Sequence, residues 1–189
     1  MDEIFQKLWN RLQNADRIVF VGIGEEKMSD DGVGPYIISN FLDLDVENVR
    51  FINANIDPMA RVDEIINFHP SHLVILDTCD LKADPGTVSI LEREHMQDHV
   101  PISSHTIPIH IVIDLIVQKL PDVDVFMIGF VPQSLEGFET LRLYKSDEYS
   151  IDDKNENENL PFFDFQLTPV IQNVADQMIE IIKELVEKL

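Results

Sequence analysis

Cysteine is almost absent from this chain, which contains one, Cys79, in 189 residues. A single thiol excludes an internal disulfide framework and any zinc or iron–sulfur site built from several cysteines, and it suits a reducing compartment. No apolar run approaches the length of a membrane span. Residues 1–14 show an amphipathic helical pattern rather than that of a signal peptide. We therefore expect a cytoplasmic protein that does not insert into membranes.

Basic residues are also scarce. The 14 lysines and arginines stand against 35 aspartates and glutamates, which gives a formal net charge of -21. Such a field repels nucleic acids and anionic membrane surfaces, so both are excluded as partners. It suits basic protein segments or cations, although many of the acids serve only to keep the surface soluble.

The signatures of several common enzyme classes are missing as well. Gly22-Ile-Gly24 follows an apolar run as a dinucleotide-binding turn would, but Lys27 stands in place of the third glycine. The chain has no Gly-Lys-Ser/Thr phosphate loop, no Gly-x-Ser-x-Gly elbow and no His-Glu-x-x-His helix. The usual serine hydrolase and zinc protease signatures are therefore excluded, and a nucleotide-binding turn is a weaker interpretation.

The chain does contain a regular alternation of apolar strands and amphipathic helices. The predicted strands are Arg17–Ile23, Val49–Ala54, His72–Asp77, Thr87–Leu91 and Val123–Val131. The predicted helices are Met1–Asn14, Pro35–Leu42, Met59–Phe68, Ile107–Leu120 with Pro108 in its first turn, and a long final helix capped by Thr168 and Pro169. This order predicts an α/β fold with three layers: a mostly parallel twisted sheet of about five strands with helices on both faces. Residues Thr87–Leu91 are expected near a sheet edge or antiparallel to the other strands.

Two polar segments interrupt this alternation. Glu92–Ser104 is polar and contains histidines, and we interpret it as a loop. Residues 144–160 are acidic, with too few apolar side chains to anchor to a core, and are predicted to form an exposed, mobile insertion. We favour surface decoration over a docking arm for this insertion. The length fits one domain over residues 1–189, and we expect a monomer.

Three polar groups are predicted to meet at one edge of the sheet. In an open parallel sheet, ligands bind beyond the carboxyl ends of the strands. Asp30 or Asp31 follows the first strand, Asp77 ends the third, and His105 precedes a helix. Neighbouring residues of an extended loop point to opposite sides, so only one of Asp30 and Asp31 is expected to be a ligand. Two carboxylates and an imidazole suit a divalent transition metal such as nickel or zinc.

Other candidates for chemistry are weaker. Cys79 lies two residues after Asp77, but a buried, inert thiol is the favoured interpretation over a nucleophile. His95 and His99 are spaced to share a helix face and to bind a metal together, yet a solvated polar face explains them better.

An ordered set of short motifs resembles a known family, the nickel-iron hydrogenase maturation endopeptidases of the type that processes hydrogenase 3. The motifs are Gly22-x-Gly24, Asp30-Asp31-Gly32-Val33-Gly34-Pro35, Ile75-Leu76-Asp77, Pro85-Gly86, Ser104-His105, residues 131–136, and Leu167-Thr168-Pro169. Each motif alone is weak, but their order and spacing are specific. The likeness runs from about residue 17 to the last helix and implies a phosphorylase/hydrolase-like fold.

This resemblance implies an activity and a partner. The family removes a C-terminal extension from the precursor of the hydrogenase large subunit once nickel is loaded. By the resemblance, Asp31, Asp77 and His105 contact nickel that the precursor carries, and zinc or another divalent cation is expected to substitute. The metal would polarise the scissile carbonyl. Three alternatives remain for the group that attacks this carbonyl: metal-bound water, an acid such as Asp31, or neither of these.

The chain departs from the family pattern beside this site. Glu25 stands where the family usually has asparagine. Two interpretations of Glu25 remain: it binds substrate or adds a metal ligand, or it is a solvated acid of the loop. Asp30 is assigned a structural role, with substrate binding as the alternative. Two other functions also stay open: a non-catalytic nickel-binding or assembly factor for hydrogenase, and a general metallopeptidase.

Overall fold

The structure, a computed structural model, describes residues 1–99, 107–135 and 166–189. The strands are β1 (Ile18–Ile23), β2 (Val49–Asn55), β3 (His72–Thr78), β4 (Val88–Glu92) and β5 (Asp124–Phe130). The helices are α1 (Asp2–Leu12), α2 (Val33–Ser39), α3 (Val62–Phe68), α4 (Arg93–His99), α5 (Ile109–Lys119) and α8 (Pro169–Lys188), with short 3-10 turns η1 (Ser29–Gly32) and η2 (Pro58–Arg61).

The five strands form one sheet in the order β2-β1-β3-β5-β4. Neighbours are parallel except for β4, which pairs antiparallel with β5 at the edge of the sheet. The two central strands β1 and β3 are almost completely buried, as their continuous apolar sequences predict. The predicted α/β fold, with Thr87–Leu91 as an antiparallel edge strand, is confirmed.

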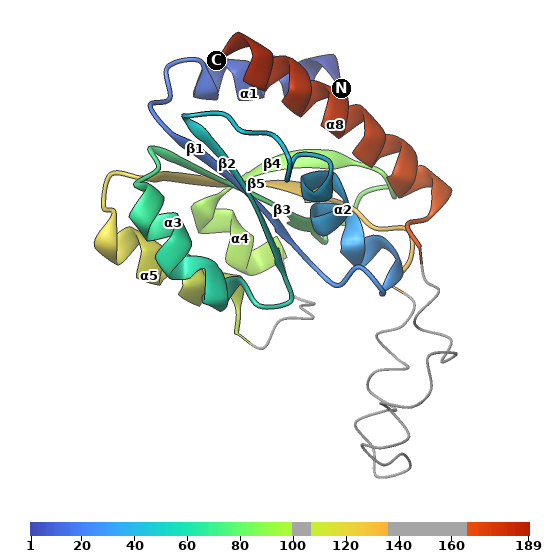
Figure 1. Ribbon diagram of the computed structural model, residues 1–189. Coiled ribbons are helices and arrows are strands. Elements are labelled where there is room, and N and C mark those ends of the chain that lie inside the picture. The colour runs from blue at the N-terminus through green and yellow to red at the C-terminus, as the bar shows by residue number, and fades with distance from the viewer. Residues whose placement is uncertain (100–106, 136–165) are drawn as a thin grey trace.

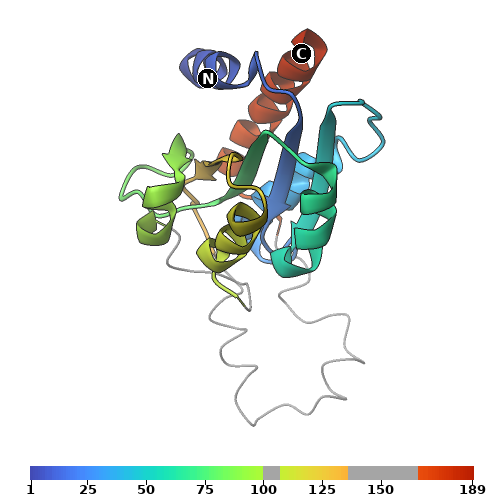
Figure 2. The same cartoon turned by 90° about the vertical axis from the view of Figure 1, so that its left-hand side faces the viewer.

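Helices cover both faces of this sheet (Figure 1). One core cluster joins the sheet to α1, α2 and α8, which place Leu8, Ile37 and Met178 against it. The other cluster joins it to α3, α4 and α5 through Ile65, Met96 and Ile113. Figure 2 shows the two terminal helices, α1 and α8, on one side of the strands and the green and yellow helices α3, α4 and α5 on the other. Within the described residues, no helix has the length and apolar character to cross a membrane.

A charged cluster fixes α1 to the amino end of β5. The guanidinium of Arg11 donates two hydrogen bonds of 2.6 Å to the carboxylate of Asp124 and two more to Glu92. It also lies 4.1 Å from the ring centre of Phe126. His72, at the start of β3, places Nε2 3.6 Å from Asp124. These contacts lie at the opposite end of the strands from the predicted site, so they serve the fold rather than the chemistry.

Three sequence predictions about local structure were wrong. Residues 93–99 form α4 rather than a loop, because Met96 is completely buried and anchors this short helix. Asp30 and Asp31 lie in η1, which leads directly into α2, and not in an extended loop. Pro108 is the N-cap of α5 and not a first-turn residue, since its ψ of 135° is extended. The predicted insertion at 144–160 lies outside the described residues.

Candidate active site

The candidate site is built where β1 and β3 end and the chain turns into α2. Gly34, in the first turn of α2, lies directly against both strands. A β-carbon at this position would be 2.2 Å from the carbonyl oxygen of Leu76 and 2.6 Å from that of Ile23. Only glycine permits this approach, and the approach places η1 at the carboxyl ends of the two central strands.

Asp31 lies in η1 and is 2% exposed. Its Oδ2 accepts a hydrogen bond of 2.7 Å from the backbone N–H of Glu25. Gly24 makes this turn possible, because its φ is +130° and a β-carbon there would lie 1.8 Å from the backbone oxygen of Asp31. The glycines around this acid therefore fold the loop after β1 back onto η1.

Asp77 is the other buried acid of this edge, also 2% exposed. It occupies the next-to-last position of β3, beside Gly129 of β5. Its Oδ1 accepts a hydrogen bond of 2.7 Å from the backbone N–H of Thr78. The structure thus places Asp31 and Asp77 at the same carboxyl edge, on neighbouring segments that meet through Gly34.

His105, the third predicted metal contact, lies outside the described residues. Within residues 1–99, 107–135 and 166–189, no group of three or more histidine, cysteine, aspartate or glutamate side chains is arranged to hold a metal ion. Oxygen donors from Asp31 and Asp77 suit a divalent cation, but two carboxylates do not complete a site. The three-residue metal contact therefore stays a prediction.

Asp30 is completely buried, and its carboxylate accepts four hydrogen bonds. Oδ2 accepts from the backbone N–H groups of Gln133 and Ser134, each at 2.8 Å, and from the hydroxyl of Thr168 at 3.1 Å. Oδ1 accepts from the backbone N–H of Thr168 at 2.7 Å. In a 3-10 turn successive side chains are about 120° apart, so Asp30 and Asp31 point in different directions. Asp30 joins η1 to the segment after β5 and to the start of α8.

The partners of Asp30 were not recognised from the sequence. Thr168 was identified only as the N-cap of α8, and its Oγ1 does accept from the N–H of Ile171 at 3.5 Å. The same hydroxyl donates to Asp30. The signal was indirect, since residues 131–136 and 167–169 belong to the set of motifs without any chemistry assigned to them.

The remaining candidates have local partners. Glu25 is half-buried, and its Oε1 accepts from the backbone N–H of Lys27 at 3.2 Å, within the same turn. Burial, together with the charges of Asp77 and Asp80, raises the pKa of Cys79 to about 12. Such a thiol is protonated at neutral pH and is a poor nucleophile. His95 is exposed on α4, and Nδ1 of His99 is 3.1 Å from the backbone oxygen of Asp80.

Fold and site together define a three-layer α/β protein with two buried acids at the carboxyl edge of its central strands. The crystal structure of the NiFe hydrogenase maturation protease HycI from Thermococcus kodakarensis KOD1 has the same fold, with a TM-score of 0.72 over 97% of this chain and 99% of that one, at 21% identity. HybD, the hydrogenase maturating endopeptidase of Escherichia coli, matches with a TM-score of 0.61 at 18% identity, over 90% of this chain and 92% of that one.

Sequence comparison gives the same family. The chain is 25% identical over 139 residues to a Methanocaldococcus jannaschii protein assigned by name to the hydrogenase maturation proteases, covering 69% of this chain and 81% of that protein. The family model described as hydrogenase maturation protease, HycI, matches residues 38–143, more than half of the chain. The chain therefore belongs to the hydrogenase maturation protease family, as its motifs indicated, and is a peptidase of that class.

Proposed function

We propose that this protein removes a C-terminal extension from the nickel-loaded precursor of a NiFe hydrogenase large subunit, and that it recognises the nickel already bound by the precursor. The observation that carries the proposal is the placement of Asp31 and Asp77, both buried, at one edge of the sheet. Membership of the hydrogenase maturation protease family supports the reaction class.

Asp31 and Asp77 would contact nickel as part of the substrate. The backbone N–H groups of Glu25 and Thr78 orient their carboxylates, so that little reorganisation accompanies binding. His105 completes the proposed set. Hydrolysis of the peptide bond also needs a group that takes a proton from the attacking water, and Asp31 is our candidate for that role.

The chain's own contribution is then positioning. The nickel of the precursor would supply Lewis-acid polarisation of the scissile carbonyl, and the two acids would hold the cleaved segment beside it. A precursor without nickel would lack the group that the acids recognise. Zinc or another divalent cation in the precursor is expected to support weaker processing, because carboxylates and imidazole bind several such ions.

The test is cleavage of a purified nickel-loaded precursor, read as the appearance of the shortened large subunit. Asp77→Asn removes the charge at nearly constant shape and is expected to lower the rate at least 100-fold, as are Asp31→Asn and His105→Ala. Asp80→Asn is the matched control, because Asp80 is an exposed acid three residues further on. Unchanged cleavage by Asp77→Asn would remove Asp77 from the site.

Two other outcomes separate the remaining alternatives. Tight binding of the nickel-loaded precursor without any cleavage would mean a nickel-binding assembly factor. Cleavage of short unrelated peptides at a rate comparable with the precursor would mean a general metallopeptidase. Full processing of a nickel-free precursor would overturn recognition of nickel while leaving the peptidase activity in place.

A further inference from the structure

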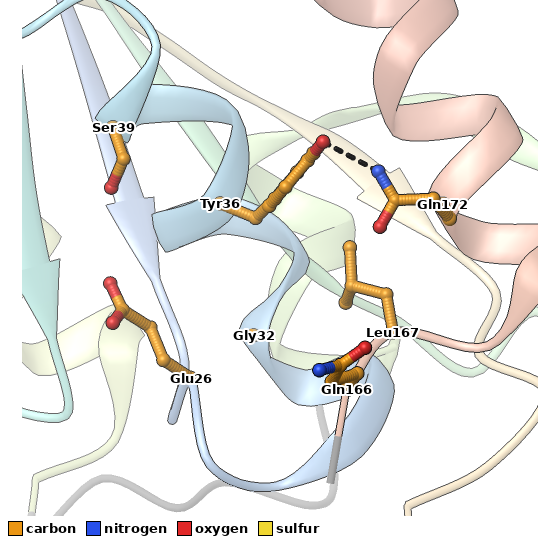
Figure 3. A pocket seen from close by; sticks show the side chains of 7 residues that line it. All are labelled: Glu26, Gly32, Tyr36, Ser39, Gln166, Leu167 and Gln172. Atoms are coloured by element: carbon orange, nitrogen blue, oxygen red, sulfur yellow. Dashed lines mark hydrogen bonds between the residues drawn. The ribbon is translucent and has the colours of Figure 1, made fainter. Parts of the chain in front are cut away.

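An open pocket lies beside the candidate active site, between α2 and the start of α8 (Figure 3). Its volume is about 380 Å³. Gly32, which lines the pocket, directly follows Asp31 in the sequence, so the pocket lies near the turn that contains the candidate catalytic acid. This volume is near the small end of the range for ligand sites, roughly 300 to 1,000 Å³, and suits a side chain rather than a folded partner.

One wall of the pocket is held by a fixed hydrogen-bond network. The hydroxyl of Tyr36 donates to Oδ1 of Asp176 at 2.9 Å, and Nε2 of Gln172 donates to both of these oxygens, at 2.5 and 3.0 Å. Burial, with the bond to Asp176, raises the pKa of Tyr36, so the phenol stays protonated and keeps donating. The acid thereby also fixes the orientation of the Gln172 amide, because a reversed amide would turn its oxygen toward a carboxylate.

This network leaves hydrogen-bond acceptors facing the pocket. The side-chain amide nitrogen of Gln172 is used in the network, and its carbonyl oxygen lies on the side of Leu167 (Figure 3). The carboxylate of Glu26 lies across the pocket, where its Oε1 accepts from the side-chain amide of Asn53 at 3.1 Å. That neutral donor does not cancel the charge of Glu26. Among the described residues that line the pocket, none is basic.

We propose that this pocket receives a basic side chain, lysine or arginine, from the precursor polypeptide within a few residues of the cleaved bond. Its aliphatic stem would lie against the ring of Tyr36 and the side chain of Leu167. Its cationic group would reach the carboxylate of Glu26 across the pocket. The overall charge of -21 attracts the same kind of segment. This assignment rests on the proposed function, whose site it extends along the substrate.

The test compares Glu26→Gln with the wild-type protein on the nickel-loaded precursor. The variant is expected to raise KM roughly five- to tenfold with kcat nearly unchanged, because the contact is made equally in the ground state and the transition state. Glu187→Gln, at the other end of α8, is the control and should change neither constant. A role of Glu26 in folding alone would lower the melting temperature without this separation of KM from kcat.

A double-mutant comparison identifies the basic residue of the precursor that enters the pocket. Each lysine and arginine flanking the cleavage site is replaced in turn by alanine, and one replacement should raise KM with the wild-type protein but not further with Glu26→Gln. Unchanged KM for Glu26→Gln, or equal sensitivity of both proteins to every replacement, would overturn the pocket assignment. If wild-type protein cleaves nothing, the proposed function fails instead. The same variants are then compared by precursor binding, where equal affinity of Glu26→Gln and wild type would also overturn the assignment.

Discussion

Replacing Asp30 by alanine gives the sharpest test of how the site is held together. The substitution removes a completely buried carboxylate that accepts four hydrogen bonds, three of them from backbone N–H groups. The donors belong to Gln133, Ser134 and Thr168, which lie more than 100 positions away in the sequence. The change therefore acts on the joint between η1, the end of β5 and the start of α8.

The magnitude follows from the donors left behind. A buried donor without an acceptor costs about 1–3 kcal/mol, and water entering the space of the lost carboxylate recovers part of this. We expect a loss of about 3–5 kcal/mol in the free energy of unfolding, a large fraction of the roughly 5–15 kcal/mol typical of a domain. For a chain of this size, about 2–4 °C of melting temperature is lost per kcal/mol, so a decrease of roughly 10 °C is expected.

Urea unfolding followed by circular dichroism measures this loss, with Asp43→Ala as control because the Asp43 side chain is exposed. The control should stay within about 0.5 kcal/mol of wild type. Asp30→Asn keeps the shape of the side chain and one acceptor oxygen, so its free energy of unfolding should lie between those of Asp30→Ala and wild type. If the free energy of unfolding of Asp30→Ala lies within about 1 kcal/mol of the wild-type value, the four hydrogen bonds do not hold this joint and the reasoning is refuted.

Four further predictions use other parts of the structure. Burial lowers the pKa of His72, so the unfolded chain binds the extra proton first and stability should fall as pH decreases below about 6.5, a slope that His72→Gln should abolish in urea titrations. The hydrogen bonds from Arg11 lower the pKa of Asp124, so its contribution, present above about pH 4, should be lost at still lower pH and be absent in Asp124→Asn. Cys79 should resist iodoacetamide in the native state, with precursor cleavage unaffected, and rapid native alkylation would contradict its raised pKa. Gly34→Ala should lose about 3 kcal/mol or more of stability, because its β-carbon meets backbone oxygens rather than movable side chains; a stable variant would show that η1 does not need this approach.

The strands and the acids that end them were predictable because their signals are local. A strand buried on both faces needs a continuous apolar run, and β1 and β3 have one. Asp77 at the end of such a run, and Asp31 after a glycine-flanked turn, are therefore visible in the sequence. Their meeting at one edge follows from parallel pairing, which the alternation of strands and helices already predicts.

The short elements were harder to predict because they depend on tertiary contacts. Helix α4 has a polar sequence that does not stand out, and its buried Met96 side chain packs in the core cluster on one face of the sheet. The 3-10 turn η1 forms because Gly34 reaches the strand ends and Gly24 adopts a positive φ. Local helix propensity, which depends on a few neighbouring residues, predicts neither of these contacts.

The sequence by itself determined the class of this protein: the order of strands and helices, the family motifs, and the acids Asp31 and Asp77. Only the tertiary structure decided which donors Asp30 binds and that Glu26 and Gln172 line one pocket. The physical reason is the range of the interactions. Hydrophobic periodicity is set by neighbours along the chain, whereas a buried carboxylate is satisfied by donors that folding brings from 103 to 138 positions away.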